Sequence, residues 1–330
     1  MVPHPESCES KTCTAVVLAG GEGTRLRPLT NERPKPVIPL TNRPFIHYQF
    51  NHFLEAGIDT VILTLSYRPD VLRSILGDRY KGLSILYTEE PEPRGTGGAI
   101  ARLTEMASGD FVVTNGDVLC PCRVMDLIEF HRSRENDVSL LLVEVDDPSR
   151  FGVVDIDRED RILAFVEKPS LEEAPSHWIN GGMYILSSSV IEEIPPDRPS
   201  SIEREIFPAL IRKGYRVGGF RYQGYWVDVG TVDSYRKVHE DYLDGRWTWQ
   251  DNVQAGRIDR VQRSFFENPP AEPTLRVYDS IIWSGFNPGR DIRVERSVLA
   301  DRVTVGDHAF LRGAVVAPDT QIPADAVVEE

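Results

Sequence analysis

The sequence of 330 residues lacks long apolar runs and has fewer basic than acidic residues. No run of 18 apolar residues occurs, which excludes a membrane-spanning helix. The N-terminal letters MVPHPESCESKTC lack the basic start and apolar stretch of a secretory signal. Lys and Arg number 37 and Asp and Glu 51, a formal net charge of −14. Such a chain is a poor candidate for binding nucleic acid or an anionic membrane.

Cysteine is also scarce, with only Cys8, Cys13, Cys120 and Cys122. Cys120 and Cys122 are separated by one proline, so they lack the two-residue gap of a zinc knuckle, and no His pair follows at ligand spacing. The pattern argues against a structural zinc site. It favours free thiols in a reducing compartment, and we expect a cytoplasmic protein.

Short apolar runs alternate with helical patterns over residues 14–145. The run 14–19 ends in two glycines and has the length and composition of a strand buried on both faces. The alternation predicts a Rossmann-like α/β fold with a mostly parallel sheet and helices on both faces. Strands are expected at 14–19, 60–65, 84–87, 111–114 and 138–145, and helices at 44–56, 69–76, 99–106 and 123–133.

After residue 146 the strands become shorter, which suggests a second lobe packed on the end of the sheet, closed by a helix at 231–243. Near the C-terminus, apolar pairs begin at Ile281, Val298 and Val315, each 17 residues from the next. This spacing is close to three hexapeptide units, one coil of a parallel β-helix. The predicted organisation is a flexible leader (1–13), a main domain (14–243), a connector (244–276) and a short β-helix (277–330).

The first turn, L-A-G-G-E-G-T-R-L-R-P-L-T over residues 18–30, is rich in glycine. Glycine lets backbone N–H groups approach a phosphate closely because no Cβ intervenes. Neither a Walker loop nor G-x-G-x-x-G spacing is present. Arg25 follows the glycines directly, and Lys35 lies between two prolines ten residues further on. Together these groups predict a binding site for a polyphosphate.

Seven motifs in order resemble those of the sugar-1-phosphate nucleotidyltransferases, also called nucleoside-diphosphate-sugar pyrophosphorylases. The resemblance covers residues 14–243, and part of that family carries a C-terminal left-handed parallel β-helix. The motifs are L-A-G-G-x-G-T-R-L-x-P-L-T from Leu18, P-K-P at Lys35, E-P-x-G-T from Glu92, N-G-D at Asp117, F-G-V-V from Phe151, E-K-P at Lys168 with N-G-G from Asn180, and W-V-D-V-G-T at Asp228.

This resemblance implies transfer of a nucleoside monophosphate from a nucleoside triphosphate to a sugar-1-phosphate, with Mg²⁺ as cofactor. The implied catalytic residues are Arg25, Lys35 and Asp117, and the implied metal ligands are Asp117 and Asp228. Purely structural roles remain open for both acids: Asp117 could be a helix cap and Asp228 a turn residue. The implied nucleotide-binding residues are Leu18, Ala19, Gly20, Gly21, Gly23, Thr24, Glu92, Gly95 and Thr96. The implied sugar-phosphate-binding residues are Gly152, Glu167, Lys168, Asn180 and Gly181.

The E-P-x-G-T loop is more like that of the mannose-1-phosphate guanylyltransferase branch, which favours GTP, although Arg94 replaces the usual apolar residue beside the base. Mannose- or glucose-1-phosphate is the first expectation for the acceptor. Heptose- and cyclitol-phosphates remain open, as do dTTP, ATP and UTP. A nucleotide-sugar-sensing regulatory subunit is the alternative of another class, and an added acyltransferase activity is a weaker one. We expect the tail to serve stability or contacts in a homo-oligomer, and its removal to spare the active-site residues.

Overall fold

The computed structural model describes residues 13–41, 43–89, 94–106, 109–248, 258–259, 263–267 and 270–329. Glu92 and most of the predicted leader therefore lie outside the described residues, as do parts of the predicted connector. Within the described ranges, no helix is both long and apolar enough to cross a membrane.

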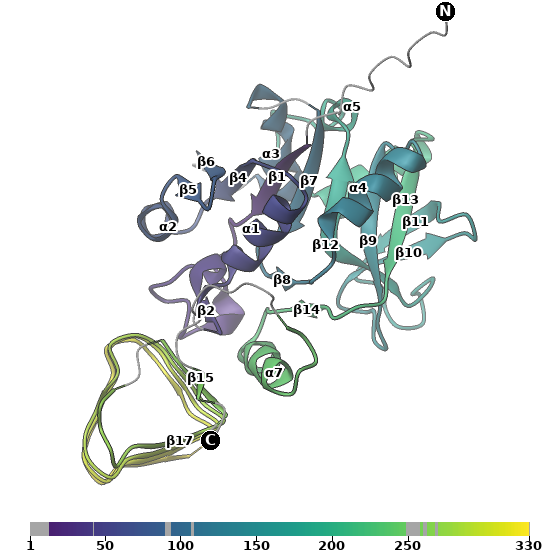
Figure 1. The fold of residues 1–330 in the computed structure, drawn as a ribbon. Coiled ribbons are helices and arrows are strands. Elements are labelled where there is room, and N and C mark those ends of the chain that lie inside the picture. The colour runs from purple at the N-terminus through teal and green to yellow at the C-terminus, as the bar shows by residue number, and fades with distance from the viewer. Residues whose placement is uncertain are drawn as a thin grey trace, which may run out of the picture.

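A ten-stranded sheet forms the centre of the larger part of the molecule (Figure 1). In its first half, the two-residue strand β5 pairs antiparallel with β6 at the sheet edge. The other four strands of this half are parallel, because β1 pairs with β4 and β7, and β4 pairs with β6. These are the short apolar runs predicted from the sequence, and burial on both faces explains their composition. The bounds in this half are β1 Cys13–Leu18, β4 Thr60–Leu65, β5 Arg79–Tyr80, β6 Leu83–Glu89 and β7 Asp110–Asn115.

The strands after residue 138 extend this same sheet, so the expectation of a second lobe was wrong. The nine-residue strand β12 pairs antiparallel with both β7 and β9, which joins the later strands directly to the first half. Pairing with β12 satisfies the backbone groups that β7 would otherwise leave exposed at a sheet edge. The bounds are β9 Val138–Glu144, β10 Gly152–Ile156, β11 Ile162–Glu167, β12 Trp178–Leu186 and β13 Val217–Tyr222.

Helices cover both faces of the sheet. Alternate residues of β1 show this, because Ala15 and Val17 belong to one buried cluster and Val16 to the other. The first cluster includes residues of α1, α2 and α4, and the second includes residues of α3, α5, η4 and α6. The bounds are α1 Ile46–Glu55, α2 Pro69–Leu76, α3 Gly95–Ala101, η3 Leu103–Glu105, α4 Val124–Ser133, α5 Ser188–Ile191, η4 Ile202–Ile206 and α6 Phe207–Arg212.

The remaining elements of this domain lie outside the large sheet, and three of them contain Arg25 (η1), Lys35 (η2) and Asp228 (β14). They are η1 Thr24–Leu26, η2 Lys35–Val37, β2 Pro39–Leu40, β3 Arg43–Pro44, β8 Val118–Leu119, β14 Val227–Asp228 and helix α7 Val232–Leu243. Figure 1 shows β2 and α7 on the side of the sheet domain that faces the C-terminal part.

The C-terminal part is a parallel β-helix, seen end-on as a triangle in Figure 1. Ile281 pairs with Val298 and Val298 with Val315, which confirms the 17-residue coil. The stack already includes β16, so it begins before the predicted boundary at 277. The bounds are β15 Ile258–Asp259, β16 Ser264–Phe266, β17 Arg276–Tyr278, β18 Ile281–Ile282, β19 Asn287–Pro288, β20 Arg293–Glu295, β21 Val298–Leu299, β22 Thr304–Val305, β23 Phe310–Arg312, β24 Val315–Val316, β25 Gln321–Ile322 and β26 Val327–Glu329.

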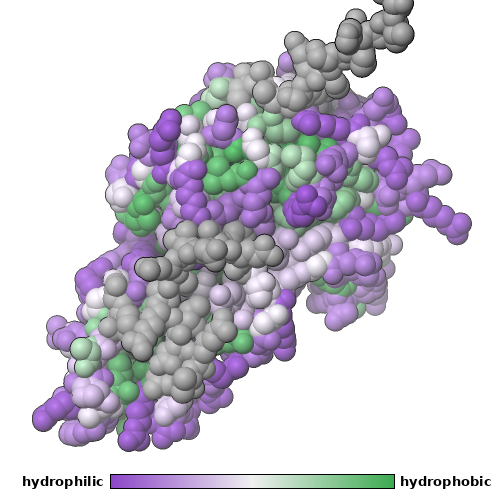
Figure 2. Space-filling model, in the orientation of Figure 1, coloured by the Kyte–Doolittle hydropathy of each residue, from purple (hydrophilic) through white to green (hydrophobic). Residues whose placement is uncertain are grey.

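The face drawn in Figure 2 is hydrophilic over most of its outer rim. Hydrophobic residues show mainly over the sheet domain, in the upper part of the view. The side chains that fill the β-helix, such as Val294, Leu299 and Leu311, are fully buried. The apolar residues of the repeats therefore form an interior and not a surface patch.

Candidate active site

The glycine-rich turn is held in a fixed shape by contacts to its own continuation. Gly23 has φ 64, and a Cβ there would lie 3.0 Å from Thr30 Cγ2. The Thr30 hydroxyl donates a 2.8 Å hydrogen bond to the Gly23 carbonyl. The buried side chains of Leu26 and Leu29 anchor the residues that follow. Glycine is therefore required at this position, and the fixed turn sets the backbone beside Arg25.

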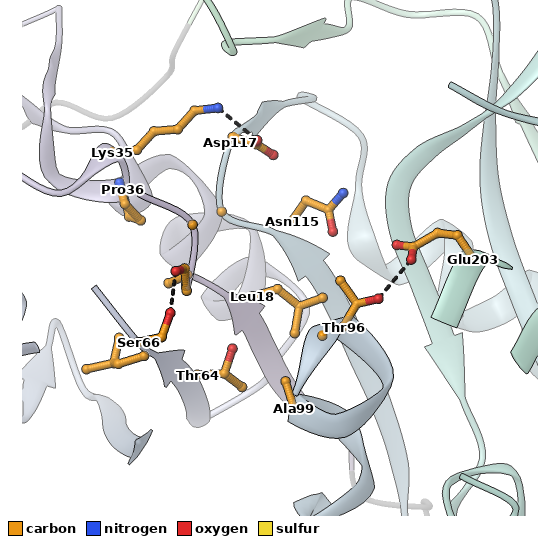
Figure 3. Close-up of a pocket in the computed structure, with 16 residues that line it drawn as sticks. Leu18, Lys35, Pro36, Thr64, Ser66, Thr96, Ala99, Asn115, Asp117 and Glu203 are labelled. Carbon is orange, nitrogen blue, oxygen red and sulfur yellow. Dashed lines mark hydrogen bonds and ion pairs between the residues drawn. The ribbon is translucent and has the colours of Figure 1, made fainter. Parts of the chain in front are cut away.

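A cavity of about 350 Å³ opens at the carboxyl ends of the parallel strands, where ligands bind in open α/β sheets. Figure 3 shows its lining, with Leu18, Thr64 and Ala99 on one side and Lys35 and Asp117 at one end. The predicted nucleotide-binding residues in the lining are Leu18, Ala19, Gly20, Gly21, Gly95 and Thr96. Gly23 and Thr24 support the turn without being in that lining.

Glu203 is a cavity residue that the sequence analysis missed. Its carboxylate accepts a 2.8 Å hydrogen bond from the Thr96 hydroxyl, and the Thr96 hydroxyl accepts one from the Ile202 N–H (Figure 3). The Gly97 N–H donates to the Ser200 carbonyl at 2.9 Å, which ties α3 to the segment before η4. Because Glu203 lies more than 100 residues from Thr96 in the chain, no local pattern indicated this contact.

Lys35 joins the two acids predicted to bind metal. Its Nζ lies 2.8 Å from Asp117 Oδ2 and 4.0 Å from Asp228 Oδ1. Asp117 follows β7, and Asp228 ends β14, which pairs with β8 immediately after Asp117. The Val229 N–H also donates to the Asp117 carbonyl at 2.9 Å. Three residues distant in sequence thus form one cluster.

Asp228 occupies an unusual electrostatic environment. Burial raises the pKa of its carboxyl group, and the charge of Asp117 raises that pKa further. The positive charges of Lys35, Arg25 and Arg150 act in the opposite direction. Oδ1 of Asp228 is buried and has no hydrogen-bond partner among the described residues. An unsatisfied buried carboxylate oxygen is the kind of group that a bound cation would complete.

The donor set fits Mg²⁺ better than a metal held entirely by protein. Among the described residues, no group of three or more His, Cys, Asp and Glu side chains could hold a metal ion. Mg²⁺ is commonly bound by one or two carboxylates together with substrate phosphates and water. Asp117 and Asp228, whose Oδ1 accepts no hydrogen bond among the described residues, match that pattern.

A second cavity, of about 640 Å³, reaches this cluster at Asp228. Its lining includes three predicted site residues, Arg25, Lys168 and Asp228. Arg25 lies against the backbone after Asp228, since a Cβ on Gly230 would be 3.0 Å from Arg25 Nη2. The lining residues that were not predicted include Ser149, Arg150, Phe151, Trp226, Thr231, Ser234 and Lys237.

The other predicted sugar-phosphate-binding residues contact neighbouring parts of the protein and do not line this cavity. A Cβ on Gly152 would lie 2.4 Å from Phe165 Cζ, so only glycine fits there. Glu167 Oε1 is 3.5 Å from Lys168 Nζ. The side-chain oxygen of Asn180 accepts a hydrogen bond from the Gly182 N–H. The carbonyl of Gly181 accepts one from Trp226 Nε1 at 2.8 Å. These four residues lie outside the lining of both cavities.

The β-helix packs directly on the loop that carries Arg25 and Lys35. Leu26 and Leu29 share a buried apolar cluster with Ile281, Trp283 and Val298. Trp283 Nε1 donates to the Tyr235 hydroxyl at 3.0 Å, and that hydroxyl donates to the Pro39 carbonyl. These contacts argue against the expectation that removal of the tail would spare the active-site residues, because removal would expose the core beneath their loop.

Comparison with known proteins agrees with this arrangement. A family model described as nucleotidyl transferase matches residues 14–245. A mannose-1-phosphate guanylyltransferase of Mycobacterium tuberculosis is 39% identical over 295 residues, covering 88% of this chain and 80% of the relative. A mannose-1-phosphate guanyltransferase of Candida albicans is 34% identical over 325 residues, covering 93% and 86%.

Among solved structures, HddC from Yersinia pseudotuberculosis in complex with GMP-PN has a TM-score of 0.59 and 32% identity, covering 69% of this chain and 99% of that chain. A UDP-glucose pyrophosphorylase complexed with UDP-glucose, at 22% identity and a TM-score of 0.64, supports the fold alone, covering 71% of this chain and 99% of that chain. From its sequence, fold and match over the whole sheet domain, this chain belongs to the nucleotidyl transferase family and is a nucleotidyltransferase.

Proposed function

We propose that the protein transfers a nucleoside monophosphate from GTP to a sugar-1-phosphate, with Mg²⁺, and releases pyrophosphate. One observation carries this proposal: lining residues of the two cavities contact each other in the Lys35–Asp117–Asp228 cluster. Lys35 and Asp117 line the first cavity, Asp228 lines the second, and Lys35 contacts both acids. A reaction that joins two ligands through the α-phosphorus of one of them needs such a junction.

The chemistry needs positioning and charge rather than a general base. The second pKa of a phosphate monoester is about 6, so the attacking phosphate oxygen is already ionised at neutral pH. The barrier lies in bringing two polyanions together and in stabilising charge on the transferring group. In the proposed mechanism, Arg25 holds the β- and γ-phosphates and Lys35 holds the α-phosphate. Lys168 binds the phosphate of the acceptor.

Asp117 and Asp228 are the residues that would hold Mg²⁺. When bound, the ion neutralises phosphate charge and orients phosphate oxygens. The two carboxylates would hold the ion beside the contact between the cavities, and the charge of Lys35 reduces the repulsion between them. The buried Asp228 Oδ1, which accepts no hydrogen bond from the described residues, supports this assignment.

The names of the relatives support the choice of substrates. Relatives from Mycobacterium tuberculosis and Candida albicans are mannose-1-phosphate guanylyl- or guanyltransferases, and the related HddC structure contains GMP-PN. GTP and mannose-1-phosphate are therefore the first pair to test. The next substrates to test are the other nucleoside triphosphates and the glucose-, heptose- and cyclitol-phosphates. They matter because one hydroxyl contact in a pocket can reverse a substrate preference.

The test measures pyrophosphate release by the purified protein with Mg²⁺, for five nucleoside triphosphates against a panel of sugar-1-phosphates. We expect GTP with mannose-1-phosphate to give the highest kcat/KM. Asp117→Asn should lower kcat at least about 100-fold, the scale of losing an electrostatic catalytic group. No pyrophosphate from any pair would contradict the proposal. An unaltered Asp117→Asn rate would contradict the role given to this acid.

A regulatory subunit that senses nucleotide sugars is the alternative of another class. Such a subunit would not need a complete set of phosphate-handling groups. Here Arg25, Lys35 and Lys168 are all present, and the acids Asp117 and Asp228 lie within 4.0 Å of Lys35. These contacts favour the active enzyme. A protein that binds nucleotide sugar but releases no pyrophosphate in any arm would favour the regulatory role.

A further inference from the structure

The second cavity contains more positive charge than the predicted residues account for. Four basic residues line it: Arg25, Arg150, Lys168 and Lys237. Asp228 is the only acidic residue in the described lining. In a chain with a net charge of −14, such a concentration of cations indicates a site for an anionic ligand.

Arg150 and Lys168 line this cavity from two adjacent segments of the chain. Arg150 precedes Phe151 and the first residue of β10, and β10 pairs with β11 in the register Gly152 to Glu167. The Lys168 N–H donates to the Phe151 carbonyl at 2.9 Å, so the chain before β10 and the chain after β11 lie side by side. Each contributes one cation to the same cavity.

The two arginines of this cavity differ from its two lysines in having no hydrogen bond or ion pair among the described residues. Lys237 Nζ lies 2.9 Å from Asp241, and Lys168 Nζ lies 3.5 Å from Glu167. Among the described residues, Arg150 forms neither an ion pair nor a hydrogen bond, and it is exposed. Its guanidinium can therefore bind a ligand without first breaking a hydrogen bond or an ion pair.

The position of Arg25 suggests a division between the two arginines. Arg25 extends from η1 and lies against Gly230, beside Asp228 and the nucleotide-binding turn. Arg150 instead belongs to the segment that leads into β10, next to Lys168. Both arginines line the second cavity, but Arg25 comes from the nucleotide-binding turn and Arg150 from the segment beside Lys168.

We propose that Arg150 binds the phosphate of the sugar-1-phosphate together with Lys168. A planar guanidinium can donate two parallel hydrogen bonds to a phosphate, which fixes its orientation as well as its position. Lys168 supplies the second charge as a point donor. The phosphate dianion then faces the Lys35–Asp117–Asp228 cluster. There its oxygen attacks the α-phosphorus of GTP, and pyrophosphate leaves. This inference rests on the proposed function, because it assigns the acceptor of the same reaction.

The test compares Arg150→Gln, Arg150→Lys and the control Arg158→Gln in steady-state kinetics with GTP and mannose-1-phosphate. Arg158 is also exposed, lies at the opposite end of the β10–β11 hairpin and is outside the cavity lining. Arg150→Gln should raise the KM for mannose-1-phosphate about tenfold or more, which corresponds to about 1.4 kcal/mol. The KM for GTP should stay within about twofold, and Arg158→Gln should change neither constant. Arg150→Lys should raise this KM less than Arg150→Gln does, because lysine keeps the positive charge but cannot donate two parallel hydrogen bonds.

Two outcomes would overturn the inference. The KM for mannose-1-phosphate could stay within about twofold of the unmodified enzyme in Arg150→Gln. Alternatively, only the KM for GTP could rise, which would assign Arg150 to the triphosphate.

Calorimetric titration with inorganic phosphate separates this inference from the proposed function. If the unmodified protein releases no pyrophosphate from any substrate pair, the proposed function fails. Phosphate binding that is lost in Arg150→Gln and kept in Arg158→Gln would still support the anion site. Equal phosphate binding by both variants, or none by the unmodified protein, would refute it.

Discussion

Arg33 and Asp301 form a two-point ion pair between the signature loop and the β-helix, with Nε 2.6 Å from Oδ2 and Nη2 2.7 Å from Oδ1. Arg33 lies two residues before Lys35, so the pair connects a coil of the β-helix to the residue that contacts both acids. Asp301 is buried, and Arg33 also lies over the Trp283 ring at 5.4 Å. The β-helix is therefore part of the support of the active site.

Replacing Asp301 by Asn should destabilise the protein by about 2–3 kcal/mol, because it leaves the largely buried Arg33 without its main partner. Urea unfolding at neutral pH measures this change. The control is Asp319→Asn, which breaks an exposed pair with Arg302 in the same β-helix and should cost less than about 1 kcal/mol. Equal losses in the two variants would contradict the account of the Arg33 pair.

Replacing Trp283 by Ala should cost about 3–5 kcal/mol, the range for a large buried aromatic residue. Because this side chain packs in the cluster beneath Leu26 and Leu29, kcat/KM should fall as well. Thermal unfolding and pyrophosphate release measure the two effects. Tyr278→Ala is the matched control, since Tyr278 is in the same β-helix but is exposed. A stable Trp283→Ala variant with full activity would show that the β-helix does not support the loop.

Replacement by Ala should affect stability at Gly23 and nucleotide binding at Gly21. Gly23→Ala should destabilise the protein by about 1–2 kcal/mol, because it places a side chain at positive φ. Gly21 has open space around its Cβ position and lines the first cavity. Gly21→Ala should leave the melting temperature unchanged and raise the KM for the nucleotide. Melting curves and kinetics on both variants test this, and an unchanged melting temperature for Gly23→Ala would contradict it.

His239 should make the protein less stable in acid. Burial lowers the pKa of this imidazole to about 4, while its Nε2 accepts from the Thr41 N–H and its Nδ1 contacts the Tyr235 carbonyl. The neutral ring is thus retained in the folded state, whereas the unfolded chain takes up a proton below about pH 6.5. Stability from this group is complete above pH 6.5 and is lost as the pH falls toward 4.

At pH 5 the loss from His239 should be about 2 kcal/mol relative to neutral pH. His239→Gln removes the titration, so its unfolding free energy should change less between pH 7 and pH 5 than that of the unmodified protein. Urea unfolding at both pH values gives the comparison. The same pH dependence in both proteins would contradict the assignment.

The sequence predicted the parallel half of the sheet and the β-helix well, because both depend on local patterns. The run before Gly20 and the 17-residue spacing of Ile281, Val298 and Val315 are read directly from neighbouring letters. Strand β12 was assigned to a separate lobe, since pairing between distant strands leaves no mark in local composition.

The same limit applies to the candidate site: residues in local motifs could be predicted, and contacts between distant residues could not. Lys35, Asp117 and Asp228 lie in motifs and come together in the structure. Glu203 could not be predicted, because its contact with Thr96 depends on how η4 packs against α3. Arg150 adjoins a recognised motif, but only the shape of the cavity shows that it lines the second site.

Following a radiolabel from the α-phosphate of GTP tests the central claim most directly. With mannose-1-phosphate and Mg²⁺, the account predicts that the label appears in the nucleotide sugar and that label on the γ-phosphate appears in pyrophosphate. Both transfers should be lost in Asp117→Asn. Release of the γ-label as orthophosphate, or an α-label that never joins the sugar phosphate, would contradict the account.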